Sequence, residues 1–396
     1  MFESVHLPRK AGKGLTPTRD FGKDVAERVI RFHESFPEYE PTPLRRLKRL
    51  AGALGVDEIF VKDESFRFGL NAFKALGSSY AIGRYIARRL GFDEADMTYD
   101  RLVSDETRAR LGDVTFITAT DGNHGRGVAW TANRLRQQSV VYMPRGTAAE
   151  RLENIRALGS RASITDLTYD DAVRKAAFDA RENGWVLVQD TSASDGDEMP
   201  KRIMQGYTTM ALEAERQLNG AVPTHIFLQA GVGAMAGAMA AYFADRYGDE
   251  NRPVVTVVEP DSADCLRMSA AAGEAKRAEG ESHTIMAGLN CGEPCALAWE
   301  ILRDHADHFV SIPDSAAANG MRVLGNPLSG DERIVSGESG ASTAGFVYEV
   351  LRSPALSGLR ERIGLSRASR VLLISTEGDT DRENYRRVVW DGRYPS

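Results

Sequence analysis

Short apolar runs alternate with longer segments of helical periodicity over most of this chain. Several runs are continuously apolar rather than alternating, which is typical of parallel strands covered on both faces. Strands that alternate with helices predict parallel sheets and an α/β architecture. The predicted strands are Ile59–Lys62, Val114–Thr118, Ser139–Met143, Ser163–Thr165, Trp185–Gln189, Thr224–Gln229, Val254–Val258 and Val371–Ser375. The predicted helices include Ala75–Arg89, Gly125–Gln137, Glu150–Leu158, Tyr169–Asn183, Arg202–Gln217 and Ala234–Tyr247.

One apolar stretch, residues 226–244, is long enough to consider as a membrane span. Gln229 is its only strongly polar side chain, but alanine and glycine dominate it and the charges of Asp245 and Arg246 follow at once. We therefore interpret it as a buried strand, a glycine turn and a buried helix, and predict no membrane partner.

Composition limits the class of protein. The chain has 396 residues, 42% of them hydrophobic and 27% charged, which is the balance of a globular protein of about two domains. This balance excludes disorder, collagen and coiled coil. A net charge of −6 gives no electrostatic case for nucleic acid or anionic lipid as a partner. The N-terminal residues lack an apolar core segment, so no secretory signal is predicted.

The three cysteines are too few for a disulfide framework, and a reducing cytoplasm is the default location. Cys291 and Cys295 lie four residues apart, but no histidine or second cysteine pair completes a zinc site, so we predict no bound metal. A disulfide between Cys265 and Cys291 is conceivable, but we favour the alternative that these cysteines are buried free thiols.

Three segments that follow predicted strands have unusual chemistry, and ligands in α/β sheets bind beyond the carboxyl ends of strands. The first is LQAGVGAMAGA (Leu228–Ala238), where glycines lead into a helix. Backbone amides in such a turn suit a phosphate, although a tight turn with close helix packing would give the same pattern. A dinucleotide fingerprint is disfavoured because the glycine spacing is one residue too long.

The second segment is FITATDGNHGRGVAW (Phe116–Trp130), a strand, a glycine loop and a helix. Asn123 could offer its amide to a ligand, and Asp121 would lie at the strand end. His124 taken alone is better explained as a packing residue.

The third segment is GLNAFKALGSSYAIG (Gly69–Gly83), with Lys74 among apolar neighbours at a helix start. Desolvation and the helix dipole both disfavour an ammonium there, so we expect a lowered pKa and a nucleophilic amine. A solvated surface charge is the alternative for an isolated lysine. Beside a phosphate loop, a Schiff-base role becomes the natural interpretation.

Taken together, N-A-F-K (Asn71–Lys74), T-x-x-D-G-N-H-G-R-G and G-V-G-A-M-A-G resemble the fold-type II, tryptophan synthase beta-like, pyridoxal-phosphate enzymes over nearly the whole chain. V-E-P, G-E-S-G-A and I-S-T-E-G-D-T (Ile374–Thr380) match as well. Within the group the chain most resembles the 2,3-diaminopropionate ammonia-lyases, at D-G-N-H-G, V-Q-D-T-S and S-T-E-G-D-T-D.

The resemblance implies the roles of the site residues. Lys74 would form the Schiff base with pyridoxal 5′-phosphate, and Asn123 would contact the 3′-oxygen of the cofactor. A hydroxyl, from Ser375 or Thr376, would meet the pyridine nitrogen. The phosphate would be held by the backbone amides of Gly231, Val232, Gly233, Ala234 and Met235.

Two carboxylates depart from the dehydratase pattern. Dehydratases commonly have a small residue where Asp121 stands, and Asp190 follows another strand in V-Q-D-T-S, where capping or turn formation is an equal alternative. Two acids near an amino-acid substrate suggest a second ammonium to be bound, as in diaminopropionate. Lys74 and Asp121 would remove the Cα proton from opposite faces, so both enantiomers could react. Asp121 or Asp190 would protonate the leaving ammonia.

The resulting hypothesis is an α,β-elimination of 2,3-diaminopropionate to pyruvate and two ammonia. A serine or threonine dehydratase of the same fold is the alternative, and a non-catalytic cofactor-binding or amino-acid-sensing protein is a further one. The resemblance also implies a homodimer and two domains, each a mostly parallel twisted sheet covered by helices. We place the small domain at residues 92–189 and the large domain at 1–91 and 190–396.

Overall fold

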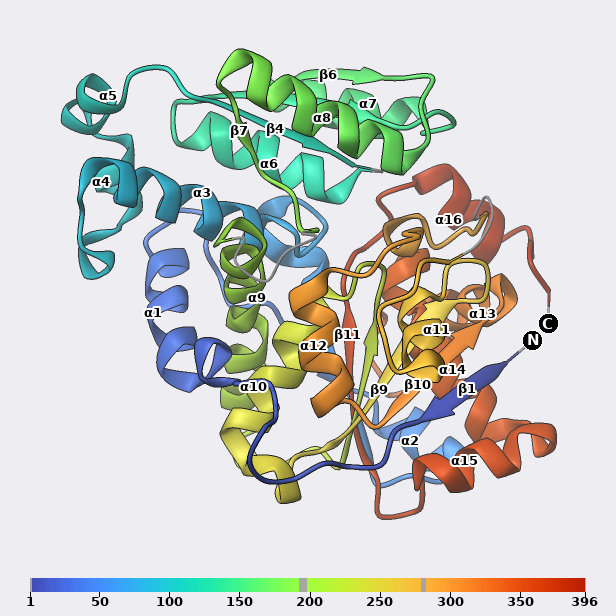
Figure 1. Cartoon of the computed structure of the whole chain (residues 1–396). Coiled ribbons are helices and arrows are strands. Elements are labelled where there is room, and N and C mark those ends of the chain that lie inside the picture. The colour runs from blue at the N-terminus through green and yellow to red at the C-terminus, as the bar shows by residue number, and fades with distance from the viewer. Residues whose placement is uncertain (1, 121, 192–197, 279–282, 396) are drawn as a thin grey trace.

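The computed structural model describes residues 2–120, 122–191, 198–278 and 283–395. Within these residues the chain forms two separate sheets with helices packed on both faces (Figure 1). One sheet has seven strands in the order β1-β10-β9-β8-β11-β3-β2, and the other has four in the order β6-β5-β4-β7. The strands are β1 (Glu3–His6), β2 (Leu44–Arg46), β3 (Glu58–Asp63), β4 (Thr115–Ala119), β5 (Gln138–Met143), β6 (Arg161–Ile164), β7 (Val186–Leu187), β8 (His225–Gln229), β9 (Val254–Pro260), β10 (His308–Ile312) and β11 (Arg370–Ser375).

Most neighbouring strands run parallel. Only the two edge strands, β1 against β10 and β2 against β3, pair antiparallel within the described chain. The last strand, β11, lies between β8 and β3 and runs parallel to both. The predicted architecture, two mostly parallel sheets covered by helices, is therefore confirmed.

The seven-stranded sheet is buried on both faces. Along β8, Ile226 and Leu228 enter one hydrophobic core and Phe227 the other, because successive side chains point to opposite faces. Helices α1, α3, α9, α10 and α12 contribute to the first core, and α2, α13, α14, α15 and α16 to the second. The α-helices are α1 (Lys23–Glu34), α2 (Lys48–Leu54), α3 (Ala75–Leu90), α4 (Tyr99–Val103), α5 (Asp105–Leu111), α6 (Asn123–Arg134), α7 (Ala149–Arg156), α8 (Tyr169–Asn183), α9 (Glu198–Gln217), α10 (Ala234–Asn251), α11 (Cys265–Ala272), α12 (Ala296–His305), α13 (Asp314–Gly325), α14 (Glu338–Arg352), α15 (Ser357–Ile363) and α16 (Arg382–Val389).

The long apolar stretch, 226–244, has the structure that its composition predicts. Its first part is β8, a turn follows at residues 230–233, and the rest belongs to α10. Both elements are buried throughout this stretch. No helix in the described part of the chain is long and apolar enough to cross a membrane.

The four-stranded sheet and its covering helices α6, α7 and α8 lie inside the segment 92–189 and form the upper part of Figure 1. The division into a small domain at 92–189 and a large domain at 1–91 and 190–396 stays a prediction.

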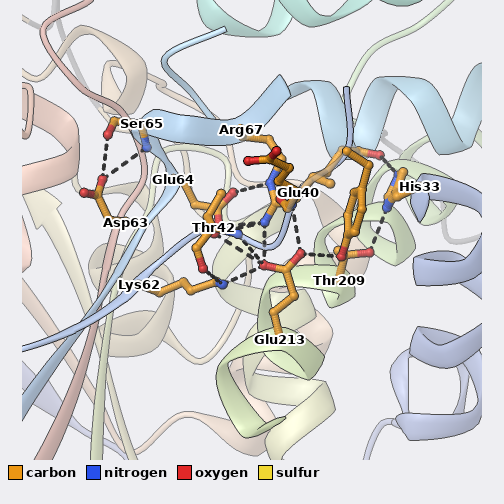
Figure 2. A network of polar contacts seen from close by, with 12 residues as sticks. His33, Glu40, Thr42, Lys62, Asp63, Glu64, Ser65, Arg67, Thr209 and Glu213 are labelled. Atoms are coloured by element: carbon orange, nitrogen blue, oxygen red, sulfur yellow. Dashed lines mark hydrogen bonds and ion pairs between the residues drawn. The ribbon is translucent and has the colours of Figure 1, made fainter. Parts of the chain in front are cut away.

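A buried polar network joins the segment after β3 to helix α9 (Figure 2). Arg67, in the 3-10 segment η2 (Glu64–Gly69), donates to Glu64 Oε2 at 2.9 Å and to Glu213 Oε2 at 2.8 Å. Lys62 Nζ lies 2.6 Å from the same Glu213 oxygen, and the Thr42 hydroxyl donates to Glu64. We call Thr42, Lys62, Glu64, Arg67 and Glu213 the Arg67 network. It anchors η2, which leads directly into the loop that carries Lys74.

Candidate active site

A cavity lies where the two sheets meet. Its walls come from the segments that follow β3, β4, β7, β8 and β11, so it lies beyond the carboxyl ends of strands as expected. The lining residues are Phe73, Lys74, Thr120, Gly122, Asn123, His124, Arg151, Tyr169, Asp190, Gln229, Ala230, Gly231, Val232, Gly233, Ala234, Met235, Gly288, Leu289, Cys291, Ser339, Thr376 and Glu377.

Lys74 immediately precedes α3, and its side chain forms an ion pair in this cavity. Nζ donates to Asp190 Oδ2 at 2.6 Å. The ammonium also lies 5.4 Å from the ring centre of Phe73 and 5.9 Å from that of Tyr207. The expectation of a lowered pKa is wrong for this arrangement. Burial is the largest single influence and would lower the pKa of Lys74, but the charge and hydrogen bond of Asp190, together with smaller contributions from Tyr207 and Cys291, raise it.

Asp190 is buried and stays ionised. Burial would raise its pKa, yet the charges of Lys74 and His124 and the hydrogen bond from Lys74 lower it to about 2. His124 donates from Nε2 to the backbone oxygen of Val188 at 2.9 Å. Its Nδ1 is a buried atom with no hydrogen-bond partner among the described residues. The cavity thus holds an amine, a fixed carboxylate and an orphaned ring nitrogen.

The glycine loop forms the opposite wall. Gly233 precedes α10 with φ of +92°, a conformation that favours glycine, and no side chain caps this helix start. A Cβ on Gly231 would lie 2.9 Å from Cys291 Sγ and 3.2 Å from Leu289 Cα, so only glycine fits there. The first amides of a helix lack intrahelical partners, and with the helix dipole they favour an anion. Gly231, Val232, Gly233, Ala234 and Met235 all line the cavity here.

Asn123 opens α6 and reaches across to the end of β11. Its Nδ2 donates to Glu377 Oε2. Glu377 also accepts from the backbone amide of Ser339 and from the hydroxyl of Thr380, each at 3.1 Å. Three segments far apart in sequence therefore converge on one buried carboxylate.

The two candidate hydroxyls after β11 have different surroundings. Ser375 Oγ shares a 2.7 Å hydrogen bond with Ser336 Oγ and does not line the cavity. Thr376 lines the cavity, and its Oγ1 accepts from Gln229 Nε2 at 3.0 Å.

Most predicted site residues meet in this cavity, with two exceptions. Ser375 lies behind its wall, and Asp121 lies outside the described residues. The roles assigned to all of these residues stay predictions.

Sequence reasoning missed several polar residues that line the cavity, among them Gln229, Glu377, Arg151 and Tyr169. Two of them had a signal. Gln229 is the single polar side chain in a long apolar run, and a buried polar group without a partner is costly. Glu377 lies in the S-T-E-G-D-T motif, next to the hydroxyls that were singled out. Nothing in the sequence around Arg151 or Tyr169 separates them from other helix residues.

Cys265, Cys291 and Cys295 are all buried thiols, and none is bridged by a disulfide. No cluster of metal-ligating side chains is present in the part of the chain that the structure describes.

These residues fit pyridoxal phosphate. The cavity offers an amine for the aldehyde, uncapped helix amides for the phosphate, and amide and hydroxyl groups for the ring. The orphaned polar atoms His124 Nδ1 and Gln229 Oε1 lie in its walls and are buried. Lys74, Asn123, Thr376 and residues 231–235 are the groups that would hold the cofactor.

Comparison with known sequences agrees with this fit. Residues 36–375 match the family model described as pyridoxal-phosphate dependent enzyme. The chain is 48% identical to diaminopropionate ammonia-lyase of Salmonella typhimurium over 93% of both chains. It is 48% identical to that of Escherichia coli over 94% of this chain and 93% of the other.

Solved structures give the same result. The holo structure of diaminopropionate ammonia lyase from Escherichia coli has a TM-score of 0.93 at 45% identity, covering 100% of this chain and 98% of that one. A threonine deaminase from Solanum lycopersicum, at 19% identity and a TM-score of 0.70, covers 96% of this chain and 97% of that one and shares the fold. The chain therefore belongs to the family of pyridoxal-phosphate-dependent enzymes and, within it, groups with the diaminopropionate ammonia-lyases.

Proposed function

We propose that this chain is a carbon–nitrogen lyase that uses pyridoxal phosphate for α,β-elimination of 2,3-diaminopropionate, giving pyruvate and two ammonia. The observation that carries the proposal is the 48% identity to ammonia-lyases of this specificity over 93% of the chain. The geometry supports it, because a partly buried amine, a buried carboxylate and a glycine loop suited to phosphate face one cavity.

The chain's own groups divide the work. When bound, pyridoxal phosphate withdraws electron density from the Cα of an attached amino acid and so weakens its C–H bond. Lys74 Nζ would take the Cα proton on its own side of the cavity. The neighbouring rings of Phe73 and Tyr207 limit the access of water to this amine, whose side chain is 18% exposed.

Asp190 would bind a substrate ammonium. Its pKa of about 2 keeps the carboxylate ionised near neutral pH, which suits a receptor for a cation better than a proton donor. A hydroxyl in place of the substrate's β-ammonium would leave a buried charge unpaired, and this would penalise serine. Asp121 remains the proposed acid for the leaving ammonia and the proposed base for the other enantiomer.

The test is a coupled assay that measures pyruvate and ammonia from each enantiomer of diaminopropionate. We expect two ammonia per pyruvate, together with a visible absorbance band that borohydride removes. A Lys74→Ala protein should lose the band and the activity, and pyruvate formation at the wild-type rate in this variant would overturn the proposal. Asp121→Asn should impair the D-enantiomer more than the L-enantiomer.

A serine dehydratase is the second candidate. A solved relative, the Escherichia coli diaminopropionate ammonia lyase, was crystallised with D-serine. Serine would give one ammonia per pyruvate, so the ratio of the two products separates these functions. A higher kcat/KM for serine than for diaminopropionate would favour the dehydratase.

A homodimer in the cytoplasm completes the proposal. The resemblance to the fold group supports the dimer, and the low cysteine content of the sequence supports a reducing compartment. Light scattering of the purified holoenzyme would give the mass, for which we expect twice the 43.4 kDa of the chain.

A further inference from the structure

Gln229 ends β8 in the middle of the seven-stranded sheet. It is 1% exposed, and β9 and β11 flank its strand on either side. A buried amide is costly unless its donors are paired, so its hydrogen bonds are informative about what it does.

The orientation of the Gln229 amide is fixed by backbone carbonyls. Nε2 donates to Ile374 O at 2.8 Å and approaches Ser339 O at 3.3 Å. Carbonyl oxygens only accept, so the nitrogen and not the oxygen of the amide must face them.

The same nitrogen also determines which atom donates in the hydrogen bond between Gln229 and Thr376. Nε2 lies 3.0 Å from Thr376 Oγ1, and an amide nitrogen cannot accept a hydrogen bond. Thr376 Oγ1 must therefore accept there, which leaves its own hydrogen for another partner. Among the described residues no acceptor for that hydrogen is found, and Thr376 lines the cavity.

We propose that Gln229 is a positioning residue that makes the hydroxyl of Thr376 a donor to the ring nitrogen of bound pyridoxal phosphate and so keeps that nitrogen unprotonated. A nitrogen that accepts this hydrogen bond uses the lone pair that a proton would need. The ring then withdraws fewer electrons, which favours elimination over reactions that need a long-lived carbanion. The inference rests on the proposed function, because it requires the cofactor in this cavity.

The test uses holoenzyme loaded with pyridoxal phosphate labelled with ¹⁵N in the ring, whose chemical shift reports protonation of that nitrogen. In the wild type we expect an unprotonated nitrogen near neutral pH. In Gln229→Met, the hydroxyl can turn to the vacated Ile374 carbonyl. The apparent pKa of the ring nitrogen should then rise by about one unit, tenfold in the protonation equilibrium, as expected for the loss of one hydrogen bond.

A double-mutant cycle separates positioning from general disruption. Thr376→Val should raise the same pKa, and adding Gln229→Met to it should change nothing further, because Gln229 acts only through Thr376. Ser375→Ala should leave the shift unchanged. The matched control is Gln205→Met, a buried glutamine of α9 that donates to Asp20 O at 2.9 Å and does not line the cavity. If Gln229→Met does not fold, Gln229→Glu replaces it, because a carboxylate would draw the hydroxyl hydrogen to itself.

The outcomes are distinguishable. A wild-type protein with no visible cofactor band would overturn the proposed function itself. A normal band with a protonated ring nitrogen in the wild type would overturn only the role of Gln229. A ¹⁵N chemical shift in Gln229→Met equal to that of the wild type would also overturn this role. The same holds if the effects of Gln229→Met and Thr376→Val on the ring-nitrogen pKa are additive.

Discussion

Lys74 and Asp190 act as a pair, and each sets the charge of the other. Burial alone would lower the pKa of the Lys74 amine and raise the pKa of the Asp190 carboxyl group, so it favours the neutral form of both. Their 2.6 Å contact reverses both tendencies, so the cavity contains a full ion pair. Replacement of one partner leaves the other as a buried, uncompensated charge.

Asp190→Asn should therefore reduce kcat/KM for diaminopropionate by about 10²–10⁴-fold, since breaking a buried pair costs about 3–5 kcal/mol. Steady-state pyruvate formation measures the effect. Asp171→Asn, on an exposed ion pair with Arg174, is the control and should be nearly silent. Activity within threefold of the wild type in Asp190→Asn would contradict the pairing.

The same pair predicts how stability depends on pH. Asp190 has a folded-state pKa of about 2 against an ordinary value of 3.8, so the unfolded chain binds the proton more readily. The contribution of Asp190 to the free energy of unfolding is present above about pH 4 and is lost as the pH falls toward about 2. The urea midpoints of wild type and Asp190→Asn should differ most near pH 5, and the difference should shrink as the pH falls from about 4 toward about 2. A gap that stays constant over this range would argue against an ionised Asp190.

Some of these residues could be identified from the sequence and others could not. Lys74 is singled out by its apolar neighbours, and Asn123 by its place between a strand and a helix. The Asn123–Glu377 hydrogen bond spans 254 positions, and no local pattern carries information over that separation. The raised pKa of Lys74 was missed for the same reason, because its cause is a residue 116 positions away.

At the scale of elements, central strands were predictable and edge strands were not. Helices cover both faces of the sheet at β8 and β11, so the side chains on both faces of these strands are apolar. The sequence of each strand is therefore a continuous apolar run. β1 and β2 are edge strands with polar side chains, E-S-V-H and L-R-R, so they carry no such signal. β10 was overlooked although its five residues are buried, and β7 is two residues long where five were predicted.

The turn between β8 and α10 should tolerate no added side chain. In Gly231→Ala the new Cβ would lie 2.9 Å from Cys291 Sγ and 3.2 Å from backbone, so the loop must shift away from its anion-binding geometry. We expect the affinity for pyridoxal phosphate to fall by at least about tenfold, one lost interaction of about 1.4 kcal/mol. Titration of the apoenzyme measures it. Gly52→Ala in α2, where the added carbon meets open space, should leave affinity unchanged.

The Arg67 network should be a major source of stability for η2. In Glu213→Gln, Arg67 and Lys62 keep their charges but lose their shared carboxylate, whose pKa they lower to about 2. We expect about 3–5 kcal/mol loss in the free energy of unfolding by urea. Glu383→Gln, on an exposed pair with Arg387, should cost less than about 1 kcal/mol. Equal losses in the two variants would contradict a buried network.

At the scale of the whole molecule, the cavity joins the two sheets. Lys74 and Glu377 follow strands of the seven-stranded sheet, and Asp190 and Asn123 follow strands of the four-stranded sheet. A ligand that contacts both groups adds to the contacts between the sheets. Cofactor binding and global stability are therefore linked.

Pyridoxal phosphate at about 100 times its Kd should stabilise the folded protein by about 2.7 kcal/mol and raise Tm accordingly. Glu377→Gln should reduce this gain in stability on cofactor binding. The two carboxylate oxygens of Glu377 accept hydrogen bonds from Asn123, Ser339 and Thr380, and a glutamine amide offers only one acceptor oxygen. Glu361→Gln, an exposed residue of α15, should keep the full increment. Differential scanning calorimetry with and without cofactor measures the difference, and equal increments in both variants would refute the bridging role.

The position of β11 also determines when, during synthesis, the protein can first hold its cofactor. The last strand of the chain, Arg370–Ser375, lies between β8 and β3, so earlier strands cannot close the sheet without it. Thr376 and Glu377 follow immediately and line the cavity. A nascent chain thus cannot pair its central strand or complete the cavity until residues 370–377 have left the ribosome. Folding of the large sheet and loading of the cofactor must then wait for β11, and chains that stop before β11 should be substrates for chaperones and proteases.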